Sequence, residues 1–146
     1  MDIRQLLSKT TTVAIVGCSR DPYRASNHAA NDLIAAGYTI VPVNPKYPEI
    51  NGVHCYDDLA DVPDSIEIDI VNVFRNSEHT LEVVEAVIDR AERTGRTPVV
   101  WTQLGVSSQE AELAAIRAGI PYVQNRCIMV ELAILRREGQ GDSTNF

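Results

Sequence analysis

The sequence predicts an α/β protein with a Rossmann-like three-layer fold and a mostly parallel five-stranded sheet. Three observations predict it: short apolar runs rich in β-branched residues, longer segments with apolar residues at helical spacing between them, and glycines that end both kinds of segment. Such alternation is typical of a parallel sheet covered by helices on both faces. A length of 146 residues, of which 45% are hydrophobic, fits one domain with a proper core.

The first half of the chain holds two predicted strands with a helix between them. Thr12–Val16 (TVAIV) is a β-branched apolar run that stops at Gly17, which is typical of a buried strand. Asn27–Ala36 has apolar residues at helical spacing and is followed by a glycine, a common helix stop. Thr39–Val43 (TIVPV) is the second predicted strand.

The middle of the chain continues the same alternation. Asp69–Phe74 (DIVNVF) is the third predicted strand. Thr80–Arg93 is predicted as a helix because its apolar residues recur at spacings of three and four, with a glycine soon after it. Pro98–Trp101 (PVVW) is the fourth predicted strand.

The last third adds two helices and a short strand. Ser107–Ala118 is predicted as a helix, with its first or second serine as the N-cap. Pro121–Val123 is the fifth strand, and Ile128–Arg137 is the closing helix. Residues 1–137 are therefore predicted to form one domain, and residues 138–146 a polar tail that we expect to be frayed.

Composition and charge limit the classes of function. A net charge of -7 disfavours binding to nucleic acid and to anionic lipid. The sequence has three cysteines, an odd number, and none of them forms a CxxC motif: Cys18, Cys55 and Cys127. This argues against a disulfide framework and against a zinc site. No apolar run reaches the length of about 18 residues that crosses a bilayer. Asp2–Thr11 lacks the apolar segment of a secretory signal, so we expect a cytoplasmic protein.

Function should lie in the loops after the strands, because open parallel sheets bind ligands beyond the carboxyl ends of their strands. Four such loops are predicted, and they begin at Gly17, Asn44, Arg75 and Thr102.

The first loop has the chemistry of an anion site. Gly17 lets the backbone turn tightly and approach a ligand, and the helix that follows directs free N–H groups at the same point. Ser19 adds a hydroxyl, and Arg20 and Arg24 add positive charge. Only the first glycine of the dinucleotide fingerprint G-x-G-x-x-G is present, and the alternative is that Gly17 merely ends a strand. On the binding hypothesis, we expect Gly17→Val to block the ligand while leaving the fold largely intact.

The second loop bears on the choice of cofactor. Folds that bind NAD end their second strand with an acidic residue for the ribose hydroxyls. Here Asn44 and Lys46 follow the strand, and the next carboxylate along the sequence is Glu49. A lysine at this place suits a ribose that carries a phosphate, as in coenzyme A or NADP; the alternative is a proline turn with a solvated lysine. Arg75 adds a further cation at a strand end.

Several segments in this order resemble a known family. VAIVGCSR, GYTIVPVNPKYPEINGVHCYDDLADVP, DIVNVFRNSE, VVWTQLGV and NRCIMVELAIL resemble the small single-domain coenzyme A-binding proteins, which are similar in fold to the amino-terminal domain of the succinyl-CoA synthetase α subunit. The resemblance extends from about Thr12 to Leu135. Two positions depart from the family, which often has alanine at Cys18 and a His-Arg-like pair at Leu132-Ala133.

The resemblance implies a site that crosses the strand ends. It implies the pyrophosphate at Gly17, Ser19 and Arg20, the adenosine end near Lys46, the adenine and ribose side along Val73, Phe74, Arg75 and Ser77, and the pantetheine arm beside Thr102 and Gln103. The full set of candidate cofactor-binding residues is Gly17, Cys18, Ser19, Arg20, Arg24, Asn44, Lys46, Val73, Phe74, Arg75, Ser77, Thr102 and Gln103.

Other conspicuous residues have ordinary interpretations. Trp101 at a strand end is interpreted as a core or rim residue. His28 is interpreted as a surface residue, and the other two histidines have no metal-ligand partners at useful spacing. Cys127 and Glu131 share a helix face; Cys127 is either buried or a thiol with a lowered pKa beside a helix N-terminus.

Three hypotheses of function follow. The first is a non-catalytic protein that binds coenzyme A or an acyl-CoA as a small-molecule ligand and passes its output to an unidentified protein partner. The second is the CoA-binding component of a multi-subunit acyl-CoA ligase, whose phosphorylated histidine lies on a further domain. The third is an NADP-binding redox protein. We identify no catalytic constellation in the sequence.

Overall fold

The computed structural model describes the backbone of residues 1–144 and side chains as far as Gly139. Its centre is a five-stranded sheet in the order β2-β1-β5-β6-β7, in which every neighbouring pair is parallel. The strands are β1 (Thr12–Val16), β2 (Thr39–Val43), β5 (Ile70–Val73), β6 (Val99–Thr102) and β7 (Tyr122–Val123). The predicted Rossmann-like parallel fold is confirmed.

The chain reverses its direction across the sheet between β1 and β5. From β1 it moves outward to β2, then returns to the other side of β1 and continues through β5 and β6 to β7. The chain therefore leaves β1 for a helix on one face of the sheet and leaves β5 for a helix on the other face, which creates a crevice at the carboxyl ends of these two strands.

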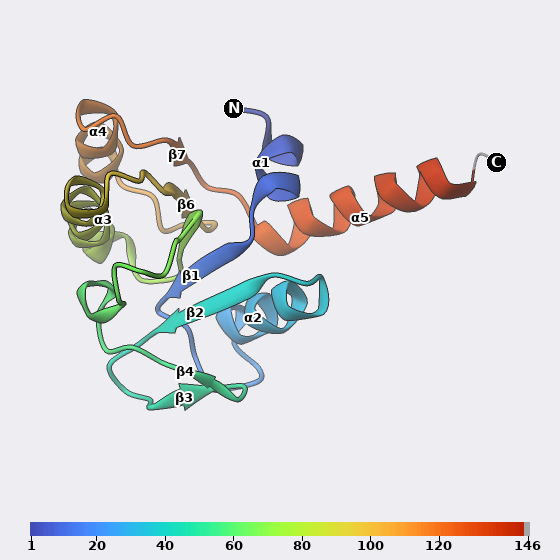
Figure 1. The fold of residues 1–146 in the computed structure, drawn as a ribbon, viewed down its shortest axis with the longest axis horizontal. Coiled ribbons are helices and arrows are strands. Elements are labelled where there is room, and N and C mark those ends of the chain that lie inside the picture. Colours follow the sequence, from blue (N-terminus) through green and yellow to red (C-terminus); the bar gives the residue numbers. More distant parts are fainter. Residues whose placement is uncertain (145–146) are drawn as a thin grey trace.

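Helices cover both faces of the sheet (Figure 1). The helices α1 (Ile3–Lys9), α2 (Ala25–Ala35) and α5 (Ile128–Thr144) lie on one face, and α3 (Thr80–Thr94) and α4 (Gln109–Arg117) on the other. Alternate residues of each strand enter the two cores. In β1, Val13 and Ile15 pack toward α2, whereas Ala14 and Val16 pack toward α3.

Most of the predicted helices are present with small shifts at their ends. Gly95 ends α3 in the left-handed conformation, with φ of 73°. The hydroxyl of Ser108 accepts from the Ala111 N–H, so Ser108, and not Ser107, is the N-cap of α4. The closing helix does not end at Arg137, because α5 continues into the predicted tail as far as Thr144. Residues 145 and 146 of that tail lie outside the described part.

A short helix and a two-stranded hairpin are absent from the sequence-based prediction. The short helix α1 is capped by Asp2 and buries Leu7 against the sheet. A hairpin pairs β3 (Glu49–Ile50) with β4 (Val53–His54), and Asn51 and Gly52 form its turn with φ of 52° and 80°. An Asn-Gly pair is a common signal for such a turn, so this hairpin was open to prediction.

Candidate functional site

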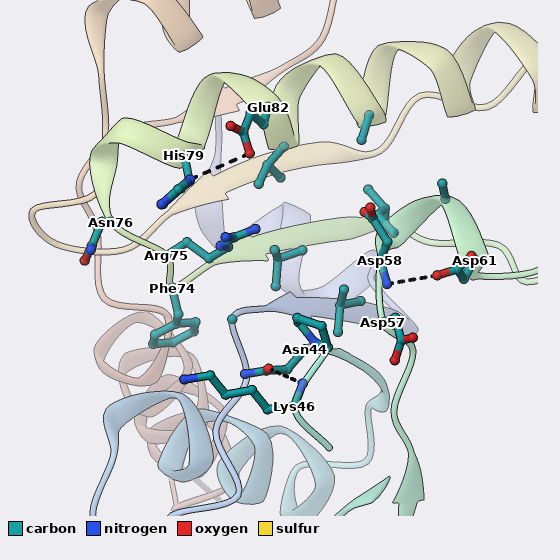
Figure 2. A pocket seen from close by; sticks show the side chains of 18 residues that line it. Asn44, Lys46, Asp57, Asp58, Asp61, Phe74, Arg75, Asn76, His79 and Glu82 are labelled. Atoms are coloured by element: carbon teal, nitrogen blue, oxygen red, sulfur yellow. Dashed lines mark hydrogen bonds and ion pairs between the residues drawn. The ribbon is translucent and has the colours of Figure 1, made fainter. Parts of the chain in front are cut away.

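A cavity of about 790 Å³ opens at the carboxyl ends of β1, β2 and β5 (Figure 2). It lies between the 3₁₀ turn Leu59–Asp61 on one side and the start of α3 on the other. Five of the candidate residues line it, from three different strand ends: Gly17, Asn44, Lys46, Phe74 and Arg75.

Gly17 is required by the packing of the backbone at this crevice. Its N–H donates to the Val43 carbonyl at 2.9 Å, and its φ of 84° is one that residues with a side chain rarely adopt. A β-carbon on Gly17 would stand 2.8 Å from Cγ of Arg75 and 3.2 Å from the carbonyl carbon of Phe74. A side chain at Gly17 therefore strains the backbone and crowds Arg75, so we expect Gly17→Val to destabilise the fold as well as to block the ligand.

Asn44 joins the loop after β2 to the loop after β1 and to the segment at Tyr56 by hydrogen bonds. Its Nδ2 donates to the Cys18 carbonyl in the loop after β1, and its Oδ1 accepts from the Lys46 N–H; both distances are 2.9 Å. Its own N–H donates to the Tyr56 carbonyl, also at 2.9 Å. Because these polar atoms of Asn44 bond to protein groups, the structure assigns it to holding the loops.

Three cations at these strand ends have no carboxylate partner. Within the described residues, no carboxylate lies within 4.0 Å of the charged nitrogens of Arg20, Lys46 or Arg75. Arg20 instead lies over the ring of Tyr47, 5.1 Å from its centroid. Arg24 lies 4.0 Å from Asp21, a long and exposed ion pair.

The cavity wall on the side of the 3₁₀ turn is acidic, which the sequence reasoning missed. Asp57, Asp58 and Asp61 line this wall, and Glu82 of α3 lines the other side. Tyr56 pairs with Val43 in parallel fashion, so the segment that follows runs beside the end of β2. Carboxylates therefore stand near the place where the sequence alone indicated none. In Figure 2 the Arg75 side chain points toward the middle of the cavity, while Lys46 points away from the acidic wall.

Hydrogen bonds within the chain fix the loop that carries Ser19. The Ser19 N–H donates to Oγ of Ser26, and its Oγ accepts from the Asp21 N–H at 3.0 Å. Ser19 and Arg20 do not line the cavity, and the backbone of Ser19 is hydrogen-bonded to Ser26 and Asn27 in the first turn of α2.

The remaining candidates also lie outside the cavity lining. Val73 and Cys18 are buried in the core, and Ser77 is exposed at the start of the 3₁₀ turn before α3. Thr102 is buried, and its hydroxyl donates to the Val123 carbonyl at 2.9 Å. Oε1 of Gln103 accepts from the Ile128 N–H at 2.9 Å, which satisfies the start of α5.

The thiols and histidines differ in how far solvent reaches them. Burial, and to a lesser degree Cys55, raises the pKa of the Cys18 thiol to about 12. Cys127 is half-buried at the start of α5. His28 is exposed, and His79 lines the cavity with Nδ1 3.6 Å from Glu82. Trp101 is fully buried and donates to the Arg126 carbonyl, which confirms it as a core residue.

The described residues contain no group of three or more His, Cys, Asp or Glu side chains that could hold a metal ion. Among the helices of the described chain, none is long and apolar enough to cross a membrane.

Comparisons with known proteins give consistent matches along the chain. The sequence model of the CoA binding domain matches residues 11–133. The uncharacterized protein YneT of Bacillus subtilis is 33% identical over 135 residues, which are 92% of this chain and 95% of that protein. The solved structure of a hypothetical protein from Pyrococcus horikoshii OT3 has a TM-score of 0.84 and 38% identity, and the match covers 92% of this chain and 90% of that one. The ADP-forming acetate–CoA ligase of Methanocaldococcus jannaschii is 34% identical over 67 residues, which are 46% of this chain but 10% of the ligase.

Proposed function

The chain belongs to the CoA-binding domain family, and from this premise we propose that it binds coenzyme A or an acyl-CoA at the carboxyl ends of its strands without acting on it. The observation that carries the proposal is the set of three cations, Arg20, Lys46 and Arg75, which have no carboxylate partner in the described part of the chain although the protein is acidic overall. Cations without partners at a strand-end crevice suit a ligand with several phosphates.

The two sides of the site suit different parts of such a ligand. Arg20 belongs to the loop after β1 and lies over the ring of Tyr47, the residue that follows Lys46. The N-terminus of α2, which this loop enters, also favours an anion. The acidic wall would repel phosphate, so a neutral part of the ligand with hydrogen-bond donors fits there better. In this proposal the phosphates lie on the side of Arg20, Lys46 and Arg75, and the part of the cavity beside the acidic wall receives an uncharged group.

The proposal excludes turnover because the described side chains offer no activated nucleophile. Cys127 is the most accessible thiol, and Glu131 is the acid that follows it on α5. Glu131 accepts from Nη1 of Arg126 at 3.1 Å, so its carboxylate is engaged as an ion-pair partner. A carboxylate held in this way is a poor base for a thiol.

Calorimetric titration of the purified protein tests the binding half of the proposal. We expect saturable binding of CoA and acetyl-CoA and no comparable binding of NAD or NADP. Binding of NADP or NAD in preference to CoA would overturn the proposal.

Incubation with acyl-CoAs, with and without ATP and magnesium, tests the non-catalytic half. We expect thiol release at the uncatalysed rate, with Cys127→Ser as the matched variant. Faster release that disappears in Cys127→Ser would make Cys127 catalytic and refute this half.

A dinucleotide is the second candidate ligand, because Asp57 and Asp58 stand beside the end of β2. Dinucleotide-binding folds use a carboxylate near that position for the ribose hydroxyls. The same titration separates the two candidates: loss of dinucleotide binding in Asp57→Asn, with CoA binding absent in the wild type, would favour the second.

A further inference from the structure

Three asparagine side chains form a closed ring beside the loop that carries Ser19. Asn31 donates from Nδ2 to Oδ1 of Asn27 at 3.2 Å, and Asn27 donates to Oδ1 of Asn51 at 3.2 Å. Asn51 closes the ring by donating to Oδ1 of Asn31 at 2.9 Å. Asn27 and Asn31 belong to α2, and Asn51 belongs to the turn between β3 and β4. The ring therefore joins two segments that lie 20 residues apart or more.

The ring is connected directly to the Ser19 loop. Nδ2 of Asn27 also donates to the Ser19 carbonyl at 2.9 Å, and the neighbouring Ser26 hydroxyl accepts from the Ser19 N–H at 2.9 Å. Both backbone polar groups of Ser19 are thus bonded to the first turn of α2. Asn27 is 2% exposed, so its amide depends on these protein partners.

The donor-to-acceptor direction around the ring fixes the orientation of each side-chain amide. Every asparagine donates to one neighbour and accepts from the other, so a rotation of one side chain that exchanges its oxygen and nitrogen breaks two hydrogen bonds. Asn51 can take part because it adopts a left-handed conformation with φ of 52°, which asparagine tolerates better than most residues. Asn51 therefore holds the orientation of Asn27 from the far side of the ring.

We propose that the ring Asn27–Asn31–Asn51 positions the Ser19–Arg20 loop for its ligand, and that Asn51 sets the affinity of the site without touching the ligand. The proposal rests on the proposed function, because it assumes that Arg20 meets a phosphate. A loop held in its binding geometry before the ligand arrives loses less conformational entropy on binding. The β3–β4 hairpin thereby affects the loop that would hold the phosphates. No residue of the hairpin's turn lines the cavity.

Asn51→Gly is the most informative variant, because glycine accepts the positive φ and removes only the side chain. Asn27→Ala is the more direct change, but Asn27 is buried and its loss could unfold the protein. Glu49→Gln, an exposed change on the same hairpin outside the ring, is the matched control. We expect Asn51→Gly to weaken CoA binding about fivefold, the factor that corresponds to one ordinary hydrogen bond, and Glu49→Gln to leave it unchanged.

A double-mutant cycle with Arg20→Ala separates positioning from a general loss of structure. If the ring positions Arg20, the effects of Asn51→Gly and Arg20→Ala on CoA affinity are not additive, although the two residues lie in different loops. The cycle of Asn51→Gly with Lys46→Ala is expected to be additive. Additive effects in both cycles, or wild-type CoA affinity in Asn51→Gly, would overturn the proposal.

Hydrogen exchange gives a readout that needs no ligand. We expect the backbone amide of Ser19, which donates to Oγ of Ser26, to exchange faster in Asn51→Gly than in the wild type, while amides of β1 are unchanged. Unchanged exchange at Ser19 would show that the ring does not hold the loop. A wild-type protein that binds no CoA would refute the proposed function, and the exchange measurement would still decide whether the ring holds the loop.

Discussion

Gly17 at the end of β1 faces Arg75 at the end of β5 so closely that a β-carbon on the glycine would stand 2.8 Å from Cγ of the arginine. The contact joins the two strands between which the chain reverses its direction across the sheet. The close packing of the loops after β1 and β5 therefore requires a glycine at position 17, whether or not a ligand binds there.

Gly17→Ala is therefore expected to lower the free energy of unfolding by about 2–4 kcal/mol, because it adds a steric clash to the strain of a positive φ. Gly105→Ala is the matched control: its φ is 79°, but no atom lies within 4 Å of the added β-carbon. We expect the control to cost about 1–2 kcal/mol, the strain alone. Denaturant unfolding measures both, and equal losses would show that the clash with Arg75 is relieved at no cost.

The fold was largely predictable because its strands are buried on both faces. The bounds of β1 and β2 were predicted to the residue. A parallel strand buried on both faces is a continuous apolar run rich in β-branched residues, and a glycine or a polar residue follows each of these two runs. The helix α1 was not predictable, because it is seven residues long and is held by burial of Leu7 against distant residues.

The site was predictable as a set of loops but not as a set of side chains. Position after a strand predicts which end of the sheet a residue reaches, and Lys46 and Arg75 do line one cavity. It does not predict whether the side chain turns outward or into the core, and Thr102 and Gln103 turn inward. Asp57 was missed because a pairing between distant residues, Tyr56 and Val43, brings it to the site.

Lys46→Ala and Arg20→Ala are each expected to weaken CoA binding by roughly 1.5–3 kcal/mol, the strength of a charge-assisted hydrogen bond to phosphate. Dephospho-CoA should bind the wild type less well than CoA, because it lacks the ribose phosphate assigned to Lys46. Titration calorimetry of each variant measures these losses.

Lys9→Ala is the control for this pair of variants, because Lys9 ends α1, away from the cavity at the strand carboxyl ends. It should bind CoA as the wild type does. Equal affinities of the wild type for CoA and dephospho-CoA would refute the assignment of Lys46 to the ribose phosphate.

Gln103→Ala is expected to act on stability rather than on affinity. The variant leaves the Ile128 N–H and the Asn72 amide without their shared acceptor inside the core, which should cost about 1–3 kcal/mol of unfolding free energy. Gln124→Ala, an exposed change in the loop before α5, should cost little. A fall in CoA affinity at unchanged stability would instead place Gln103 in contact with the ligand, as the family resemblance implied.

The Cys18 thiol should make the protein less stable in alkali. Its pKa is raised from an ordinary 9.0 to about 12 by burial, with a smaller contribution from Cys55, so the folded state holds the thiol proton more tightly than the unfolded state. Below pH 9 both states keep the proton, and the stabilisation is fully present. As the pH rises from 9 toward 12, only the unfolded state releases it, and the free energy of unfolding falls by up to about 1.4 kcal/mol per pH unit.

Cys18→Ala removes this proton and should have a shallower loss of stability between pH 9 and 12 than the wild type. Tyr38, whose pKa is also raised by burial, is present in both proteins, so its contribution cancels in the comparison. Cys127→Ala, at a half-buried position, is the matched control and should follow the wild-type curve. Denaturant unfolding at several pH values measures the slopes. If Cys18→Ala loses stability as steeply as the wild type over this range, the Cys18 thiol is not the group that titrates.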